Sequence, residues 1–166
     1  MKDSKNIWVR FILVSMGVVI ADQITKYLVK ISIPLYGRIV IIDNFFDLTH
    51  IMNPGGAFGL FAGQSPEIRK FVFLFMSSFV ALAVLWFYKL HARHSRFMGF
   101  GLALVFGGAA GNLIDRFCYG KVVDFLDFYL GSLHWPAFNV ADSAITTGMA
   151  ILIIHTIFDS SSTRDL

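Results

Sequence analysis

Long apolar segments alternate with shorter polar ones along this chain. Residues 71–88 and residues 97–114 each form a run of 18 positions without a charged side chain. A helix needs about 20 predominantly apolar residues to cross a bilayer, whereas an amphipathic helix of a soluble domain carries polar residues at every turn. The pattern therefore predicts membrane-spanning helices.

Two further segments follow the pattern with interruptions. The first has an uncharged core at residues 11–21 and continues through Asp22 and Lys26, and the last carries Asp142 in its first turn. The first core runs into Asp22 without a small-residue cleavage site, which favours a retained anchor over a cleaved signal peptide. We expect one membrane domain, residues 1–166, with four spans at about residues 7–29, 69–88, 97–116 and 139–158.

The distribution of basic residues predicts the orientation of these spans. Residues 89–96 contain three Lys or Arg side chains and no acid, as expected of a cytoplasmic loop. Both termini then also lie in the cytoplasm, and residues 30–68 and 117–138 lie on the outer face.

The two outer segments predict different structures. Residues 38–52 are rich in Ile, Val, Phe and Thr, break near Asp43, and lead into a turn sequence that begins at Asn53, which predicts two short strands. Residues 121–130 have apolar side chains at helical spacing, which predicts a short interfacial helix. The expected fold is an all-α integral membrane protein with a small extracytoplasmic β-sheet and this interfacial helix.

The composition agrees with lipid as the main surroundings of the protein. Of the 166 residues, 56% are hydrophobic and 15% are charged, and the net charge is +3. The basic residues are scattered and form no dense face, which argues against a nucleic-acid partner. Cys118 is the single cysteine, so no internal disulfide is possible. A thiol enzyme would need Cys118 beside His134 or His50, and no spacing supports that geometry.

Polar side chains near the span ends are the most informative positions. Inserting a charged side chain at mid-bilayer costs about 2.5–3.5 kcal/mol, so each such residue is expected to have an interaction partner or a functional role. Within each helix these residues are three or four positions apart and share a face, and all lie toward the predicted outer end. A buried polar site is expected where the faces converge. The residues are Asp22 and Lys26 on the first span, Asn112, Asp115 and Arg116 on the third, and Asn139 and Asp142 on the fourth.

Pairing of these charges leaves two acids without a counter-ion. Structural ion pairs are expected within two helices, Asp22 with Lys26 and Asp115 with Arg116. Asp142 has no cation within one turn, and Asp124 or Asp127 of the outer segment would lie at the same level. Two carboxylates at a partly dry site share one proton, so the charged acid can activate a water while the protonated acid hydrogen-bonds a peptide carbonyl. This is aspartyl protease chemistry without a metal or cofactor, and the helix N-terminus would favour the charged form of Asp142.

Other interpretations use the same side chains. A transporter or proton-conducting protein also needs intramembrane acids, but such proteins spread them through the membrane depth. A structural protein would tolerate Asn in place of both acids. A divalent cation could bind among oxygen ligands, which need no strict spacing: Asp115, Asp124, Asp127 and Asp142. The small residues 107–111 predict either close helix packing or a surface for an apolar substrate helix.

Five stretches in a fixed order carry a resemblance to a known family. They are DQITK at residues 22–26, NPGGAF at 53–58, GAAGNLIDR at 108–116, VVDF at 122–125 and FNVADS at 138–143. Together they resemble the lipoprotein signal peptidases, also called signal peptidase II, across most of the chain. One departure is Gly56, where the family often has Ala, and this implies a slightly different turn after Asn53.

The resemblance implies a catalytic dyad of Asp124 and Asp142 without a metal or cofactor. It also implies a set of supporting polar residues: Asp22, Lys26, Asn53, Gly55, Asn112, Asp115, Arg116 and Asn139. The implied protein is an enzyme of the bacterial cytoplasmic (inner) membrane, surrounded by lipid, with its active site near the outer face. It would remove signal peptides from prolipoproteins, cutting just before a cysteine that bears a diacylglyceryl group. Globomycin-like cyclic peptides would inhibit it.

Overall fold

The computed structural model describes residues 2–55, 63–91 and 95–162 and contains four helices and four strands. The prediction of a slightly different turn at Gly56 lies outside the described residues. In chain order the elements are α1 (Lys2–Ser32), β1 (Arg38–Ile42), β2 (Phe46–Asn53), α2 (Pro66–His91), α3 (Arg96–Tyr119), β3 (Val122–Leu130), β4 (Leu133–His134) and α4 (Val140–Ser162).

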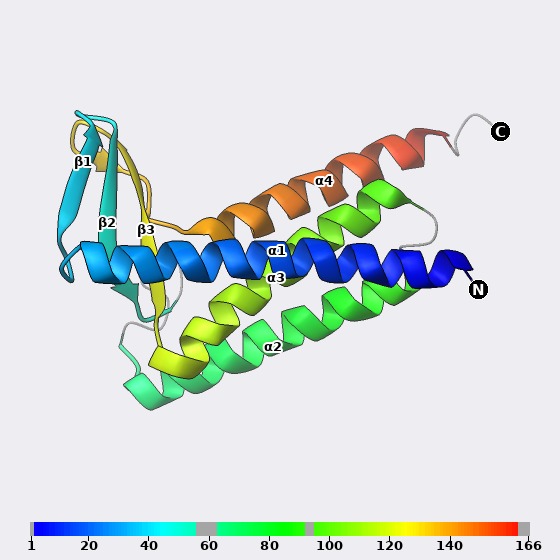
Figure 1. The fold of residues 1–166 in the computed structure, drawn as a ribbon, viewed down its shortest axis with the longest axis horizontal. Coiled ribbons are helices and arrows are strands. Elements are labelled where there is room, and N and C mark those ends of the chain that lie inside the picture. Colours follow the sequence, from blue (N-terminus) through cyan, green and yellow to red (C-terminus); the bar gives the residue numbers. More distant parts are fainter. Residues whose placement is uncertain (1, 56–62, 92–94, 163–166) are drawn as a thin grey trace.

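All four helices are long and apolar enough to cross a membrane, which confirms the four helices predicted from the apolar runs. These candidate spans are Asn6–Ser32, Pro66–His91, Arg96–Tyr119 and Val140–Phe158. Half of the most apolar window of α3 is buried, compared with 11–17% for the other three helices. The central position therefore belongs to α3, and α1, α2 and α4 pack around it (Figure 1). Many apolar side chains of these three helices are exposed on the outer surface of the bundle.

Small residues let the other helices approach α3 closely. A Cβ atom on Gly107 would lie 2.9 Å from the backbone oxygen of Ser15 in α1, and one on Gly108 would lie 2.3 Å from that of Ala141 in α4. Farther along α3, a Cβ on Gly101 would lie 3.0 Å from the backbone oxygen of Gly148. Of the two interpretations of residues 107–111, the structure supports helix packing, because α1 and α4 already occupy this face.

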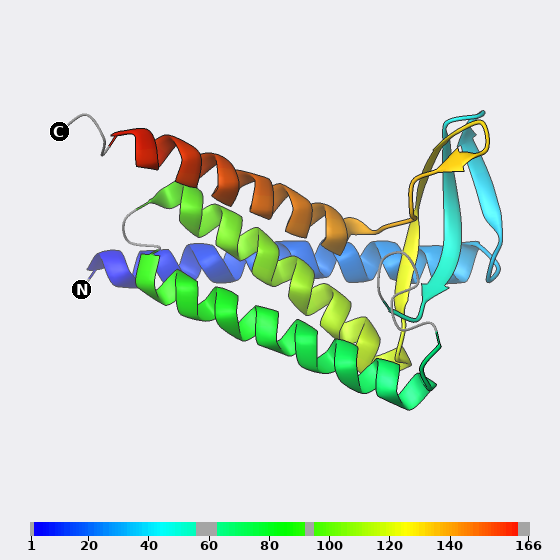
Figure 2. The same cartoon turned by 180° about the vertical axis from the view of Figure 1, so that it is seen from behind.

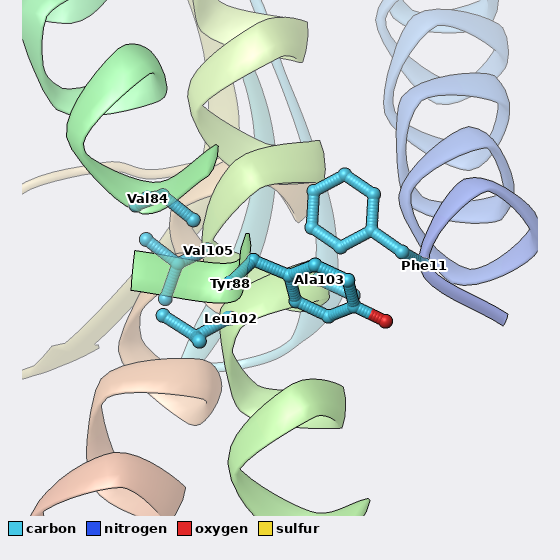
Figure 3. Packing of buried hydrophobic residues seen from close by; sticks show 6 residues of the cluster. All are labelled: Phe11, Val84, Tyr88, Leu102, Ala103 and Val105. Atoms are coloured by element: carbon cyan, nitrogen blue, oxygen red, sulfur yellow. The ribbon is translucent and has the colours of Figure 1, made fainter. Parts of the chain in front are cut away.

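An aromatic and aliphatic cluster fills the end of the bundle that holds the chain termini. Figure 3 shows Phe11 of α1 facing Tyr88 of α2, with their ring centroids 4.2 Å apart, beside Leu102 and Ala103 of α3. The hydroxyl of Tyr88 donates a hydrogen bond to the backbone oxygen of Ile7 at 2.6 Å. This cluster ties three helices together far from the sheet.

The four strands form one antiparallel sheet in the order β1-β2-β3-β4. The sheet lies at the end of the bundle opposite the two termini, as both views show (Figures 1 and 2). Strands β1 and β2, with a turn at residues 43–45, confirm the two short strands predicted for residues 38–52. Strand β2 then pairs with β3, placing Ile51 opposite Asp124.

The prediction of an interfacial helix at residues 121–130 is wrong, because these residues form β3. The apolar positions looked helical because both faces of the strand are covered, so the alternation of polar and apolar residues that marks a half-buried strand is missing. Val123 is fully buried and packs with Phe125 against Val29 of α1 and Ile33, the residue that follows this helix. Burial under α1 and pairing with β2 together decide the conformation of this segment.

Candidate active site

The polar faces of α1, α3 and α4 converge at the sheet end of the bundle and meet residues of β2 and β3 there. Lys26 is 1% exposed and Asp124 is 3% exposed, whereas Asp142 is only half-buried. Five other predicted site residues are buried, and they come from α1, α3, the turn after β2 and the position before α4: Asp22, Gly55, Asn112, Asp115 and Asn139. Asn53 and Arg116 are half-buried.

Lys26 lies at the centre of a buried charge network. Its Nζ lies 2.8 Å from Oδ2 of Asp22, 3.0 Å from Oδ2 of Asp115 and 3.0 Å from Oδ1 of Asn112. The expected pair of Asp22 and Lys26 is confirmed. The expected pair of Asp115 with Arg116 is wrong, since adjacent residues of a helix point in different directions and only Asp115 turns toward α1.

The two acids of this network also hold backbone groups of neighbouring elements. Oδ1 of Asp22 accepts a hydrogen bond from the backbone N–H of Ala141 at 2.9 Å, and Oδ2 of Asp115 accepts one from Val123 at 3.0 Å. Ala141 precedes Asp142, and Val123 precedes Asp124. The network therefore fixes the backbone next to both candidate catalytic acids.

Asp124 is held by two asparagine amides from different elements. Its Oδ1 accepts from Nδ2 of Asn139 at 2.8 Å, and its Oδ2 accepts from Nδ2 of Asn53 at 2.9 Å. Burial raises the pKa of Asp124 to about 7, with a further rise from the charge of Asp142, and the two amide hydrogen bonds oppose this rise. Asp124 can therefore carry a proton near neutral pH.

Asp142 lies in the first turn of α4, where it forms a reciprocal capping box with Asn139. The backbone N–H of Asp142 donates to Oδ1 of Asn139 at 2.9 Å, and the backbone N–H of Asn139 donates to Oδ2 of Asp142 at 3.3 Å. The other carboxylate oxygen, Oδ1, accepts from Nδ2 of Asn112 at 2.7 Å. Asp142 is half-buried, and both of its carboxylate oxygens accept hydrogen bonds.

Sequence reasoning missed two residues of α2 that hold Arg116. Nη1 of Arg116 donates to Oγ of Ser77 at 3.2 Å, and its guanidinium lies 5.6 Å from the ring centroid of Phe73. The same ring blocks any side chain at Gly55, whose φ of +129° also requires glycine. Ser77 and Phe73 lie in an uncharged run, so composition gave no signal that they belong to the site.

The structure separates Asp127 from the convergence of polar residues. Asp127 lies opposite Asp47 in the sheet and 3.0 Å from Nδ1 of His134. Of the two acids between which the sequence left the choice open, Asp124 is the one that lies beside the amides of Asn53 and Asn139. Among the described residues, no group of three or more His, Cys, Asp or Glu side chains is arranged to hold a metal ion.

The histidines considered for a thiol site have other partners. Nδ1 of His50 lies 2.8 Å from the backbone oxygen of Ile33, and Nδ1 of His134 faces Asp127. Cys118 is exposed near the end of α3. The geometry does not favour a thiol enzyme.

Comparison with known proteins gives consistent matches along most of the chain. The profile of the family described as Signal peptidase (SPase) II matches residues 14–158. The Lipoprotein signal peptidase of Desulforapulum autotrophicum is 62% identical over 151 residues, which cover 91% of this chain and 93% of the relative. That of Syntrophus aciditrophicus is 42% identical over 148 residues, which cover 89% of this chain and 91% of the relative.

Two solved structures have a similar fold, and both are described as bacterial membrane enzymes studied by the in meso method. One has a TM-score of 0.82 at 34% identity, covering 92% of this chain and 90% of that chain. The other has a TM-score of 0.79 at 32% identity, covering 89% of this chain and 92% of that chain. With the family profile and these relatives in agreement, the chain belongs to the signal peptidase II family and is a multi-pass bacterial membrane protein.

Proposed function

We propose that this protein is a membrane-embedded aspartyl endopeptidase that removes the signal peptide from bacterial prolipoproteins. It cuts just before the cysteine that bears a diacylglyceryl group. The observation that carries the proposal is the arrangement of Asp124 and Asp142, two acids from different elements. The amides of Asn53 and Asn139 donate to Asp124, and the amide of Asn112 donates to Asp142. The family of the chain supplies the substrate class.

The different surroundings of the two acids suit different roles in peptide hydrolysis. Asp124, with its raised pKa, holds the shared proton and hydrogen-bonds the carbonyl oxygen of the scissile peptide. Asp142 is charged and accepts a proton from the attacking water. When the tetrahedral intermediate collapses, the C–N bond breaks and the leaving nitrogen takes up the proton from Asp142, so the protons balance without a covalent intermediate.

The proposal includes an orientation in the membrane. Residues 89–96 and both termini face the cytoplasm, and the sheet and the acid pair lie at the outer surface. The basic residues of that loop support this orientation, and the termini lie at the bundle end opposite the sheet (Figure 1). A signal peptide lying as a helix among the lipids would then present its scissile bond at the level of the acids. Globomycin-like cyclic peptides would occupy the same place.

A transporter remains the alternative function, and the packing of the bundle favours the peptidase. The polar residues gather at the sheet end, whereas the other end is filled by apolar side chains such as Phe11, Tyr88 and Leu102. A path for ions would need polar groups along the whole membrane depth.

The test is gel-shift cleavage of a diacylglyceryl-modified prolipoprotein by the purified protein in detergent. We expect cleavage by the wild type and a loss of about 100-fold to 10,000-fold in Asp124→Asn and in Asp142→Asn, because each loses one proton-transfer group. Asp127→Asn is the matched control and should cut within about threefold of wild type, since its carboxylate faces His134 and not the amide cluster. Reactions with and without a chelator should run equally fast. Full activity in either of the first two variants would refute the mechanism.

A further inference from the structure

Each asparagine of the site has its carbonyl oxygen occupied by a fixed donor. Oδ1 of Asn53 accepts from the backbone N–H of Gly55 at 2.9 Å, and Oδ1 of Asn139 accepts from the backbone N–H of Asp142 at 2.9 Å. The side-chain NH₂ group of each must then point the other way, toward the oxygens of Asp124. Backbone groups thus decide the orientation of two amides.

The third asparagine is oriented by a side chain instead. Oδ1 of Asn112 accepts from Nζ of Lys26 at 3.0 Å, and its Nδ2 donates to Oδ1 of Asp142 at 2.7 Å. An ammonium group can only donate, so it determines which end of the amide faces it. We propose that Lys26 is a positioning residue for catalysis, because it holds the Asn112 amide with its NH₂ group toward Asp142. This inference rests on the proposed function.

The surroundings of Lys26 leave it no freedom to turn away. Its three N–H donors match three acceptors, from Asp22, Asp115 and Asn112, and the side chain is 1% exposed. Asp22 is itself bound to the backbone of α4 through Ala141. Lys26 therefore orients the amide of Asn112 in the same way as backbone N–H groups orient the amides of Asn53 and Asn139.

Removing the ammonium group would take away the shorter of the two hydrogen bonds to Oδ1 of Asn112 and leave only the one from Nδ2 of Asn139 at 3.3 Å, which is too long to fix the amide alone. Once rotated, Oδ1 of Asn112 would face the carboxylate of Asp142, and two acceptors would oppose each other where a hydrogen bond had been. Asp142 would lose the shorter of the two hydrogen bonds that align its carboxylate for the attacking water. The charged and polar groups around these side chains come from every neighbouring element: Asp22 on α1, Asp115 and Arg116 on α3, Asp124 on β3, and Asn139 before α4.

The test is a double-mutant cycle on the cleavage reaction, with kcat and KM measured separately. Lys26→Met should lower kcat about 100-fold, the effect of a misplaced catalytic group, with KM within about threefold of wild type because Lys26 does not reach the substrate. In an Asn112→Ala background the same change should alter kcat less than about threefold, because no amide is left to orient. Lys30→Met is the matched control on the next turn of α1. Lys30 bonds the hydroxyl of Tyr119, and its loss should leave kcat unchanged.

A companion variant separates this role from a purely structural one. Lys26→Met leaves two buried carboxylates without a cation, so the protein is also made as Asp22→Asn with Lys26→Met, which keeps the net charge of the three groups. It should melt close to wild type and still show the drop in kcat. An equal fall in kcat in both backgrounds, or wild-type kcat in a folded companion variant, would overturn the inference. Inactivity of Asp124→Asn in the same assay would still support the proposed peptidase, so the two ideas fail separately.

Discussion

Gly108→Ala should weaken both the packing of α3 against α4 and catalysis. The added methyl would lie 2.3 Å from the backbone oxygen of Ala141 and 2.8 Å from Cγ1 of Ile145. The first distance is more than 1 Å inside the usual contact distance of about 3.5 Å, and a backbone oxygen cannot rotate away. Overpacking of this kind costs about 1–3 kcal/mol, and the better helix propensity of Ala recovers up to about 1 kcal/mol. We expect a net loss of about 1–2 kcal/mol.

The displacement also reaches the site, because Ala141 is followed by Asp142. A shift of about 1 Å in a catalytic group can lower the rate about 100-fold, so kcat for prolipoprotein cleavage should fall by that order. The assay is thermal unfolding in detergent, where a loss of about 1.5 kcal/mol lowers the melting temperature by about 3–6 °C in a chain of this size, combined with gel-shift kinetics. Gly17→Ala is the control, since its Cβ would meet nothing within 4 Å. Equal melting temperatures and rates for the two variants would refute the close-packing argument.

Three further predictions concern charge and hydrogen bonding. Because the pKa of Asp124 is raised to about 7, the wild-type cleavage rate should fall as pH rises above about 7, where this acid loses its proton. For the same reason the folded protein holds a proton on Asp124 that the unfolded chain has already released, so the melting temperature should fall as pH rises from about 4 to about 7. If the melting temperature of Asp124→Asn fell as steeply with pH as that of wild type, this prediction would be contradicted. Arg38→Ala should change the unfolding free energy by less than about 1 kcal/mol, because the guanidinium of Arg38 is exposed beside Asp47. Tyr129→Phe should lower it by about 1–3 kcal/mol, because the fully buried carboxylate of Asp47 loses the hydroxyl that donates to it. Chemical denaturation of the two variants side by side would measure the difference.

The helices could be predicted from local sequence because a membrane helix satisfies its backbone hydrogen bonds within itself. Strand β3 could not, since its conformation depends on pairing with β2, which lies far earlier in the chain, and on cover from α1. Local spacing of apolar residues indicated a helix there, and the long-range partner decided otherwise.

The meeting of the polar faces follows from spacings of three and four residues within each helix, but the individual partners do not. Asp115 pairs with Lys26 instead of Arg116 because of how α1 and α3 are rotated against each other. Ser77 escaped notice because a lone hydroxyl in an apolar helix has many possible partners, and only the tertiary arrangement shows that it holds Arg116.

The ion pair within α1 has a consequence for biosynthesis. Asp22 and Lys26 lie on successive turns, with Oδ2 and Nζ 2.8 Å apart, so α1, which leaves the ribosome before α2, α3 and α4, carries an acid together with its own counter-ion. Either charge alone would raise the free energy of insertion by about 2.5–3.5 kcal/mol. Because the two charges form a neutral pair within α1, much of that penalty is avoided before α3 and α4 are inserted. When α3 is inserted later, its own buried acid, Asp115, comes to lie 3.0 Å from the same ammonium group, which then contacts both acids. The order of the helices along the chain thus places the cation in the membrane before the second acid that contacts it.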